Sequence, residues 1–551
     1  MTTRHLTADL LIIGGGSAGC MAAIRALELQ PDLKVMIFEK GDIKYSGSIA
    51  RGMDALNIVA IPNFTTPELY VESIQTSCQG IADVKPSYVM AARSYEMLKK
   101  LEGWGVYFPL DKNGKYRTLR YHVKGEFQTA MEEPELKVII SRKAQALGAR
   151  VINRVMGIQL LTDDGRVCGA IGMHVRTGEM VACSAKAVIV TAGGQARFTL
   201  PASGYLYGLF DYPGNSGDGF VMAHHAGAGL TGMEHTMRTM LIKDASMPLL
   251  AITVTRGGRV MDAFDNIIME NEVHTVSRMH DAFNEGRGPL RIQLRHLKPE
   301  VIEEIEHILF STERPVQERF FKGRGINFRN RDIELWPTEH QICGGHGQAG
   351  VLVDEKTRTD VPGLFVAGDV ACVPKQHLSG AFVFGEIAAE ESIGFIKANR
   401  ELRLDDGQVH SAAEIRNRRF SCTGREIHIQ EFEYKVRRII GDYLTSPKNA
   451  HKLNRWFDWS GVFKAELENQ VIVRNGHELA KLYEVEHIIK CADLSALASL
   501  ERKESRWGET HYRTDYPERD DENWLKHVVL RPGEGPVGVK VETRAVQDSN
   551  A

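Results

Sequence analysis

The fold of this chain is decided by residues 10–27, which read LLIIGGGSAGCMAAIRAL. Four branched apolar residues precede three glycines and then apolar residues at helical spacing, so the segment predicts a strand, a tight turn and a helix. Gly14 permits the turn, Gly16 lets backbone N–H groups approach a pyrophosphate, and Gly19 lets the helix pack on the sheet. The positive end of the helix favours negative charge there. The segment therefore has the pattern of a Rossmann-like nucleotide-binding motif.

A second strand supports this interpretation. Residues 35–38 are apolar and lead to Glu39, twenty residues after Gly19. A carboxylate at that strand end can accept hydrogen bonds from ribose hydroxyls. A lone glycine pattern is weak evidence, because an ordinary glycine turn gives the same letters. The order of strand, helix, second strand and acid favours a dinucleotide site.

Two later strands indicate which dinucleotide it is. Residues 187–190 are apolar and lead to Ala192 and Gly193, and residues 363–368 lead to Asp369. Each strand by itself would be ordinary α/β core. The glycine motif occurs once, near the N-terminus, and the two later strands are expected to join the same sheet. This arrangement favours a single long cofactor that crosses the domain, which suits FAD better than NAD.

Length and composition exclude several classes of protein. The chain has 551 residues, of which 43% are hydrophobic and 25% charged. It is therefore long enough for several domains or one large α/β body with insertions, and it is not a disordered or collagen-like chain. Lys and Arg number 68 against 71 Asp and Glu, a net charge of -3. This near-neutral balance gives no excess of positive charge for binding nucleic acid, but it is compatible with a local basic pocket that binds a small anion.

The cysteines and the N-terminal residues bear on location and metal content. Eight cysteines occur without any C-x-x-C pair: Cys20, Cys78, Cys168, Cys183, Cys343, Cys372, Cys422 and Cys491. They predict a reducing compartment and no metal or iron–sulfur site in this chain. The first residues run directly into the glycine motif, leaving no room for a signal peptide, and residues 10–24 are too few to span a membrane at roughly 20 residues. We therefore expect a cytoplasmic protein without a membrane span.

Beyond the glycine motif, a set of short stretches resembles a known superfamily. They are residues 45–52 (YSGSIARG) with Asn57, 215–219 (NSGDG), 285–289 (EGRGP), 337–339 (PTE), 363–369 (GLFVAGD) and 379–386 (SGAFVFGE). Residues 502–506 (RKESR) and 515–521 (DYPERDD) resemble its C-terminal tail. The chain resembles the fumarate reductase and succinate dehydrogenase flavoproteins over nearly its whole length. The branch that it most resembles is the α subunit of dissimilatory adenylylsulfate (APS) reductase.

The resemblance implies how FAD is held. Members that bind the flavin covalently have a histidine in the loop after the second strand, but here that loop reads Ser46-Gly47-Ser48, so non-covalent FAD is expected. The resemblance also places the amides of Gly380, Ala381 and Phe382 at a helix start that faces the flavin pyrimidine ring, where positive charge stabilises the reduced anion. Further expected FAD contacts are Ser17, Ala18, Lys40, Gly52, Asp218 and Glu386.

These features predict an α/β fold with three parts. A Rossmann-like FAD-binding domain is expected over residues 1–235 and 347–400, with an inserted α+β capping domain at 236–346 and a helical C-terminal domain and tail at 401–551. Helices between Trp456 and Leu500 are expected to break at Gly461 and Gly476. Residues 501–527 are rich in charges of both signs and by themselves predict a solvated surface segment. The resemblance instead wraps that segment over the body.

Basic side chains are the candidates for the substrate site, because a guanidinium binds carboxylates and sulfur oxyanions through two hydrogen bonds. Arg256 and Arg259 lie in the expected cap, and Arg238 approaches the substrate face by resemblance. For Arg256 and Arg259 the alternative is an ordinary surface cation. The resemblance implies a departure as well: Leu241 stands where APS reductases have an anchoring arginine, so the anchoring charge is either missing or moved to Arg238 or Lys243.

Three histidines are further candidates. His340 fits the H-x-x-x-G-G pattern by which succinate dehydrogenase-type members place a substrate histidine, and His346 stands where APS reductases also carry one. His377 stands where dehydrogenase-type members have a substrate arginine. For His340 and His346 the alternative is a core or capping histidine.

The leading hypothesis is an FAD-dependent oxidoreductase subunit that acts on a small anion and exchanges electrons with a separate, ferredoxin-like iron–sulfur protein. The second is dicarboxylate chemistry of the fumarate reductase, succinate dehydrogenase or L-aspartate oxidase type. The third is a flavin-bearing assembly protein that has lost catalysis.

Overall fold

In the computed structural model of the chain, a seven-stranded sheet forms around the glycine motif, with the order β6-β2-β1-β9-β8-β7 and β17 beside β9. Its strands are β1 (Arg4–Ile13), β2 (Val35–Glu39), β6 (Arg150–Asn153), β7 (Val155–Asp163), β8 (Arg166–His174), β9 (Met180–Val190) and β17 (Leu364–Val366). Strands β1, β2, β6, β9 and β17 pair in parallel, whereas β7 and β8 are antiparallel. Because Ile13, Phe38, Val190 and Val366 are in register, the residues that follow these strands meet at one edge.

The structure describes residues 3–201, 211–243, 250–270, 276–313, 317–399, 406–420 and 424–547. Helices α1 (Ser17–Leu29) and α10 (His377–Ala398) pack against each other, and α10 also packs on α3 (Val84–Gly103). A Cβ on Gly385 would lie 2.5 Å from the Ala18 carbonyl oxygen, so only glycine lets α10 pass this close to α1. This contact helps to hold the start of α10 near the glycine motif. The remaining elements of this part are α2 (Pro67–Ser77), β3 (Met53–Leu56), β4 (Thr118–Leu119), β5 (Gln128–Glu133), α4 (Leu136–Ala146) and α5 (Asp218–His225).

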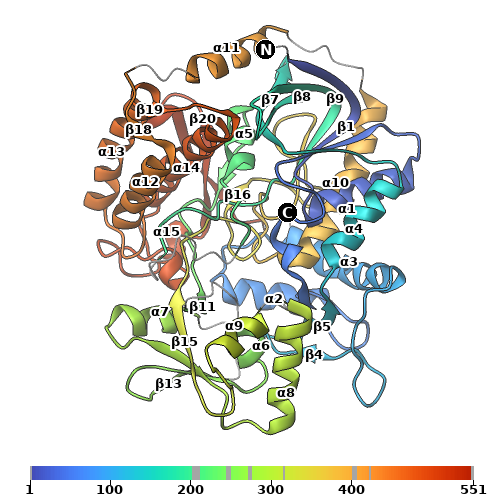
Figure 1. Cartoon of the computed structure of the whole chain (residues 1–551), viewed down its shortest axis with the longest axis vertical. Coiled ribbons are helices and arrows are strands. Elements are labelled where there is room, and N and C mark those ends of the chain that lie inside the picture. The colour runs from blue at the N-terminus through green and yellow to red at the C-terminus, as the bar shows by residue number, and fades with distance from the viewer. Residues whose placement is uncertain are drawn as a thin grey trace.

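A smaller α+β unit lies below this body in Figure 1. Its five-stranded antiparallel sheet has the order β11 (Met240–Ile242), β15 (Ile333–Pro337), β14 (Leu290–Gln293), β12 (Arg259–Met261) and β13 (Ile267–Glu270). Its helices are α6 (Leu250–Val254), α7 (Val276–Asn284), α8 (Pro299–His307), which continues into a π-helix (Ile308–Glu313), and α9 (Gln317–Gly323). Apolar side chains between Met240 and Leu335 form a hydrophobic core separate from that of the body. We call this unit the cap.

The C-terminal part is mainly helical and then returns to the body. Its helices are α11 (Asp406–Arg419), α12 (Ile429–Tyr443), α13 (Ala450–Asn469), α14 (Gly476–Glu501) and α15 (Asp521–Trp524), with short strands β18 (Ile427–His428) and β19 (Val471–Ile472). Helix α13 continues through Gly461, so the expected break there is wrong. A Cβ at Gly461 would meet no atom within 4 Å, so that helix face is open. Helix α14 does begin at Gly476.

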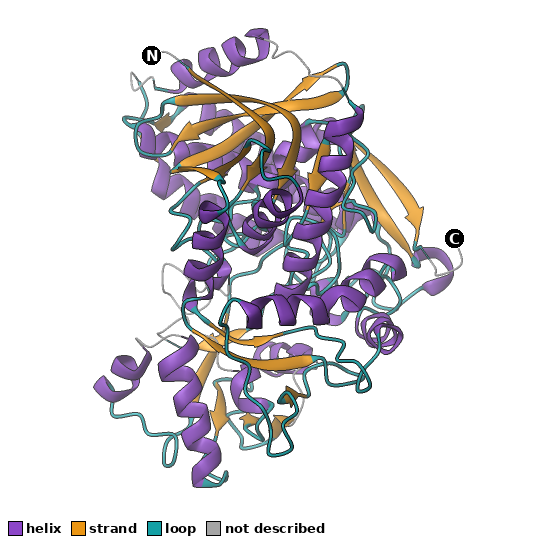
Figure 2. Ribbon diagram, turned by 90° about the vertical axis from the view of Figure 1, so that its right-hand side faces the viewer, coloured by secondary structure: helices purple, strands orange, loops and turns teal. Residues whose placement is uncertain are grey.

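The chain ends in a hairpin that completes a sheet of the body. Strands β20 (Lys526–Pro532) and β21 (Val539–Ala545) pair with each other, and β20 also pairs with β10 (Leu230–Thr231), next to β16 (Gly350–Val351). Figure 2 shows this hairpin at the side of the body, near the C-terminus.

The segment before the hairpin has several buried charged side chains beneath an exposed outer face. Arg502, Glu504, Arg506 and Arg513 are at most 1% exposed. The expectation that this segment wraps over the body is therefore confirmed, and the alternative of a free surface segment is wrong, because the opposite charges pair with each other beneath the surface.

The predicted α/β fold class, with its FAD-binding fold and helical C-terminal part, is confirmed. The exact domain boundaries stay predictions, and the one at 400–401 lies outside the described residues. Within the described ranges, no helix is both long and apolar enough to cross a bilayer.

Asp83 fastens the C-terminal hairpin to α3 and predicts a pH-dependent stability. Its Oδ1 lies 3.0 Å from Nε2 of His527 and accepts the Gln547 amide at 2.8 Å, while Arg544 pairs with Oδ2. Burial opposes ionisation, but His527 and Arg544 outweigh it and lower the pKa of Asp83 to about 2. Because this folded-state pKa is below the usual 3.8, the stabilisation is present above about pH 4 and is lost as the pH falls through 2.

We therefore expect Asp83→Asn to lower the free energy of unfolding by about 2 kcal/mol at neutral pH, which denaturant titration measures. The same titration near pH 2 should show little difference between the variant and the wild type. An equal loss at both pH values would contradict the linkage.

Candidate functional site

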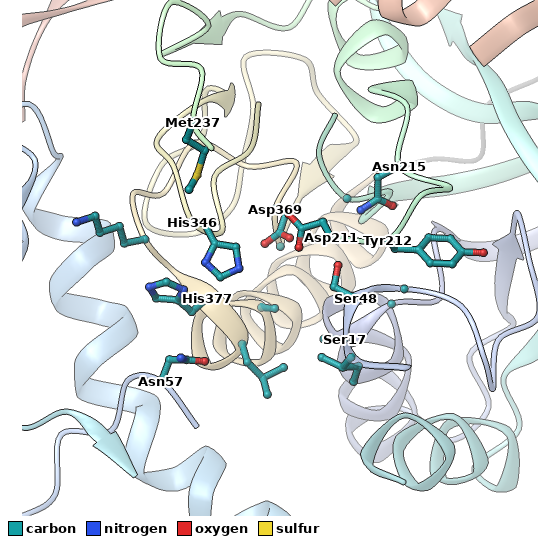
Figure 3. A pocket seen from close by; sticks show the side chains of 18 of the residues that line it. Ser17, Ser48, Asn57, Asp211, Tyr212, Asn215, Met237, His346, Asp369 and His377 are labelled. Atoms are coloured by element: carbon teal, nitrogen blue, oxygen red, sulfur yellow. The ribbon is translucent and has the colours of Figure 1, made fainter. Parts of the chain in front are cut away.

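A cavity of about 660 Å³ lies where the carboxyl edge of the large sheet, the cap and the C-terminal segment meet. Figure 3 shows its wall, to which distant parts of the sequence contribute. Ser17 and Ser48 come from the N-terminal region, Asn215 from the segment before α5, and Asp369 and His377 from the region between β17 and α10. The volume is in the range of sites that hold cofactors and small ligands.

The glycine motif forms one end of the cavity. Gly14 has φ +104°, and a Cβ there would lie 2.4 Å from the Thr191 carbonyl oxygen. A Cβ on Gly19 would lie 2.0 Å from the Gly14 carbonyl oxygen, so this glycine serves helix packing. Gly16 differs, because its Cβ would meet no atom within 4 Å and would point into open space. Gly14 and Gly16 line the cavity, so a diphosphate can approach the N-terminus of α1.

Glu39 is fixed beside this loop. One carboxylate oxygen accepts the Gly15 amide at 2.8 Å and the other accepts the Gly41 amide at 2.7 Å. These two bonds hold the carboxylate at the cavity wall with lone pairs left for ribose hydroxyls. Glu39 therefore lies at the cavity wall, and its contact with ribose hydroxyls stays a prediction.

Asp369 and Asp211 lie together on another wall of the cavity (Figure 3). Burial, with a further contribution from Asp211, raises the pKa of Asp369 to about 8. A carboxyl group that is neutral at pH 7 can donate a hydrogen bond as well as accept one. Asp369 therefore fits a partner with hydroxyl groups, such as a ribityl chain.

The start of α10 also reaches the cavity, but at residues earlier than expected. The helix begins at His377, and His377, Leu378 and Ala381 line the cavity. The Gly380 amide already donates to the Gln376 carbonyl at 2.8 Å. The expectation that the Gly380 amide faces the flavin is therefore wrong, because the first turn of the helix consumes it. The His377 amide likewise donates to the Gly345 carbonyl at 3.0 Å, so the remaining amides of the positive helix end are those of Leu378 and Ser379.

Aromatic and imidazole rings cover the start of α10. The rings of His346 and His377 are 4.9 Å apart at their centroids, and Tyr121 contacts His377 edge-on. Nε2 of His122 lies 3.0 Å from the Asn57 carbonyl oxygen. Burial lowers the pKa of His122 to about 4 and holds that of His377 well below its usual value. At neutral pH these two imidazoles are hydrogen-bonding groups without charge.

Two family models match the chain. The model described as "FAD binding domain" matches residues 9–380, which include the glycine motif, Glu39 and Asp369. The chain belongs to this FAD-binding family. The model described as "Fumarate reductase flavoprotein C-term" matches residues 462–551.

Individual relatives of this flavoprotein cover nearly all of it. A component of the fumarate reductase (CoM/CoB) of Methanothermobacter marburgensis is 27% identical, over 96% of this chain and 98% of the relative. The alpha subunit of the adenylylsulfate reductase of Megalodesulfovibrio gigas is 23% identical, over 94% of this chain and 92% of the relative. A solved adenosine-5-phosphosulfate reductase in complex with sulfite, as a covalent adduct, has a TM-score of 0.88 and 25% identity over 99% of this chain and 97% of that one. The predicted resemblance to APS reductase is confirmed.

FAD fits the residues of this flavoprotein, since an open glycine cradle, a fixed ribose acid and a hydroxyl-binding acid share one cavity. The predicted FAD residues that line it are Gly14, Gly16, Ser17, Ala18, Glu39, Lys40, Gly47, Ser48, Ala192, Gly193, Asp218, Asp369 and Ala381. The others are not among its lining residues: Gly19, Ser46, Gly52, Gly380, Phe382 and Glu386. Glu386, for example, pairs with Arg93 at 3.0 Å and Lys100 at 2.6 Å on α3. Glu386 therefore faces α3, and its ion pairs stabilise the packing of α10 on α3.

Lys40 and Asp218 connect the flavoprotein's cofactor wall to the C-terminal helices. Lys40 Nζ lies 2.9 Å from Asp218 and 2.7 Å from Glu484, and Asp218 lies 2.7 Å from His487. Burial opposes ionisation of Asp218, but Lys40 and His487 lower its pKa to about 2. Because Glu484 and His487 belong to α14, this network fixes the wall rather than leaving free charges.

The substrate candidates divide into two groups. Arg238, His346 and His377 line the cavity, whereas Arg256, Arg259 and His340 do not. Arg256 pairs with Glu304 at 2.5 Å and Arg259 with Glu270 at 2.7 Å, both within the cap.

The structure therefore corrects the expected positions of these two arginines, because acids of the cap hold them away from the cavity. His340 is buried behind the wall, where its amide donates to Thr199 Oγ1 at 2.9 Å.

Several lining residues were missed by sequence reasoning. Tyr121, His122, His280, Lys375 and Glu509 carry no local pattern that separates them from core or surface residues. Glu509 does lie close to a recognised stretch, because it is three residues after the end of the segment 502–506 that carries the resemblance. Trp507, which also lines the cavity, has the Lys375 ammonium 5.1 Å from its ring.

Proposed function

We propose that this flavoprotein is the catalytic subunit of an APS reductase-like enzyme, which acts on a small anion and exchanges electrons with a separate iron–sulfur protein. The observation that carries the proposal is Arg238, a guanidinium on the wall of the cavity that also contains the glycine cradle. A guanidinium in a largely buried site binds carboxylate, phosphate or sulfur oxyanions. FAD, when bound, supplies the exchange of an electron pair with the substrate.

The residues of the chain divide the remaining tasks. Arg238 anchors the anion at the cap side. His377 at the start of α10, with the ring of His346 4.9 Å from its own, orients a polar substrate by hydrogen bonds. The cap and the segment around Trp507 limit the access of water.

The APS branch is supported by the similarity to the reductase solved with sulfite. Dicarboxylate chemistry is the second candidate, supported by the 27% identical fumarate reductase component and by the fumarate reductase model over residues 462–551. Leu241, at the position expected to hold an APS anchor, is buried in β11 and does not line the cavity. Lys243 pairs with Glu334 at 2.8 Å and does not line the cavity, so the anchoring role falls to Arg238, the arginine among the described lining residues.

The iron–sulfur partner is supported by the names of the relatives, which are parts of larger enzymes, and by the cysteines. Seven cysteines lie in the described residues, and all of them are buried. They offer no exposed pair of thiols for a cluster. A cytoplasmic location stays a prediction from the sequence.

Sulfite and fumarate distinguish the two candidate reactions. In the APS branch, adding sulfite to the oxidised holoprotein should bleach the visible flavin band, and an unchanged spectrum would count against that branch. In the dicarboxylate branch, fumarate should reoxidise the reduced protein without oxygen. If neither anion nor APS changes the flavin spectrum, the non-catalytic assembly protein is favoured.

Arg238→Met tests the anchor. We expect the variant to retain FAD but to bind sulfite or fumarate about ten- to hundredfold more weakly, because a charge-assisted hydrogen bond of about 1.5–3 kcal/mol is lost. Spectral titration measures the dissociation constant. Arg329→Met is the matched control, since Arg329 pairs with Glu306 on the outer side of the cap. Equal binding by both variants would contradict the role of Arg238.

A further inference from the structure

Three side chains from distant segments meet at the cap side of the cavity. Arg238 lies between β10 and β11, His280 lies on α7, and Glu509 lies in a 3-10 turn (Gly508–Thr510) after α14. Arg238 Nη2 forms an ion pair with Oε1 of Glu509, and His280 Nδ1 lies 3.3 Å from Oε2 of Glu509. Their side chains are only 13%, 2% and 10% exposed.

The tautomer of His280 favours the protonated form of Glu509. Nε2 of His280 lies 3.2 Å from the Arg238 carbonyl oxygen, which only accepts, so Nε2 carries the ring proton. Burial and the nearby Arg238 hold the pKa of His280 well below its usual value, so the ring is neutral and Nδ1 is an acceptor. An acceptor 3.3 Å from a carboxylate oxygen is satisfied when that oxygen is protonated.

Glu509 is balanced between its two protonation states. Burial, with a smaller contribution from Asp281, raises its pKa to about 7 against the opposing effect of Arg238. Among the described residues, neither Glu509 oxygen nor Arg238 Nε has a hydrogen-bond partner of good geometry. His340, behind this group, is neutral at pH 7 because burial and Arg238 hold its pKa well below the usual value. The ion pair therefore keeps unused donors and acceptors at the cavity wall.

We propose that Glu509 takes up one proton when an anion binds to Arg238, and that it then delivers this proton to the substrate. The inference rests on the proposed function and names how the same site handles protons. An anion on Arg238 would lie close to the Glu509 carboxylate, and two like charges in a buried site repel each other. Protonation removes the repulsion and frees the guanidinium.

The proton balance of the cycle is closed. On binding, a proton from solvent forms an O–H bond on Glu509, and the anion replaces Glu509 at Arg238. During reduction, that O–H bond breaks and the proton moves to the substrate, for which FAD, when bound, would supply the electron pair. Glu509 is again a carboxylate and re-forms the ion pair as the product leaves.

Proton uptake is measured on the oxidised holoprotein with sulfate and malonate as probes. Calorimetric titration in two buffers of different ionisation enthalpy gives the protons taken up per anion bound. At about pH 8 the carboxylate of free Glu509 is ionised, so we expect close to one proton to be taken up per anion bound. At about pH 6 Glu509 is already protonated, so the binding of sulfate should be accompanied by almost no proton uptake. The dissociation constant should therefore rise about tenfold per pH unit above 7.

Glu509→Gln replaces the carboxylate with a neutral amide of the same shape. The variant should bind sulfate without proton uptake, with a dissociation constant that no longer depends on pH and is about tenfold lower than that of the wild type at about pH 8. Its turnover should fall at least about a hundredfold while KM does not rise, because a positioned proton donor is lost. A purely structural Glu509 would not produce tighter binding with slower turnover. Glu285→Gln, an exposed acid of the same region that pairs with Arg287, is the control and should keep the uptake.

The outcomes separate the two proposals. Anion binding by the wild type without proton uptake overturns this inference but leaves the proposed function intact. A failure of both sulfate and malonate to bind overturns the small-anion function and this inference with it. Because the wild-type measurement needs no variant, the result does not depend on whether Glu509→Gln folds.

Discussion

Gly16→Ala should give a folded protein that has lost its flavin. Gly16 lines the cavity at the N-terminus of α1, and a Cβ there meets no protein atom within 4 Å. The polypeptide therefore tolerates the methyl group, but a pyrophosphate on the helix N-terminus does not. Losing two charge-assisted hydrogen bonds of about 1.5 kcal/mol or more each weakens FAD binding at least about a hundredfold. Flavin fluorescence titration of the apoprotein measures this loss.

Gly19→Ala is the matched comparison, three residues further along the same motif. Here the Cβ would lie 2.0 Å from a backbone oxygen of Gly14. We expect this variant to lose about 1–3 kcal/mol or more of folding stability, whereas Gly16→Ala keeps the wild-type unfolding temperature as apoprotein. Wild-type FAD affinity in Gly16→Ala would mean that the cofactor does not lie on this loop.

Arg502→Met should destabilise the fold by about 3–5 kcal/mol. The Arg502 guanidinium is completely buried and donates to Glu234 at 2.7 Å and to Glu504 at 2.8 Å. It also donates to the carbonyl oxygens of Trp524 and Lys526. Methionine fills much of the volume but leaves Glu234 as a buried charge without its partner. Denaturant titration of holoprotein measures the change.

Arg519→Met is the control from the same charge-rich segment. Arg519 pairs with Asp521 in a position that is about half exposed, so its loss should change stability by less than about 1 kcal/mol. Glu234 lies four residues before Arg238, so Arg502→Met should also weaken anion binding. A loss of stability as small as that of Arg519→Met would contradict the structural role of the buried pair.

The cofactor end of the molecule was predictable because its signals are local. A strand, glycines at fixed spacing and an acid after the second strand are all close together in the sequence, and Glu39 and Asp369 lie where parallel strands end. Gly461 shows the limit of this reasoning. A glycine lowers helix propensity, but α13 has enough packing elsewhere to continue through it.

The substrate end was only partly predictable, because its residues come together from distant segments. Arg238 was expected there, but Arg256 and Arg259 pair with Glu304 and Glu270, and no local pattern reveals such partners. Glu509 and His280 were missed for the same reason, since they are 229 residues apart and meet only in the folded chain. The burial of the charge-rich segment 501–527 cannot be predicted from its composition. A segment with charges of both signs can form either a solvated surface or a buried network of ion pairs.

Every role assigned to a residue of the cavity depends on one non-covalent FAD bound there in each chain. Acid precipitation of the purified protein, followed by measurement of flavin in the supernatant and in the pellet, tests whether it is present. We predict close to one FAD per chain, all of it in the supernatant. Flavin retained in the pellet would contradict the non-covalent site, and protein without flavin that takes up none when FAD is added would contradict the cofactor and the proposed function together.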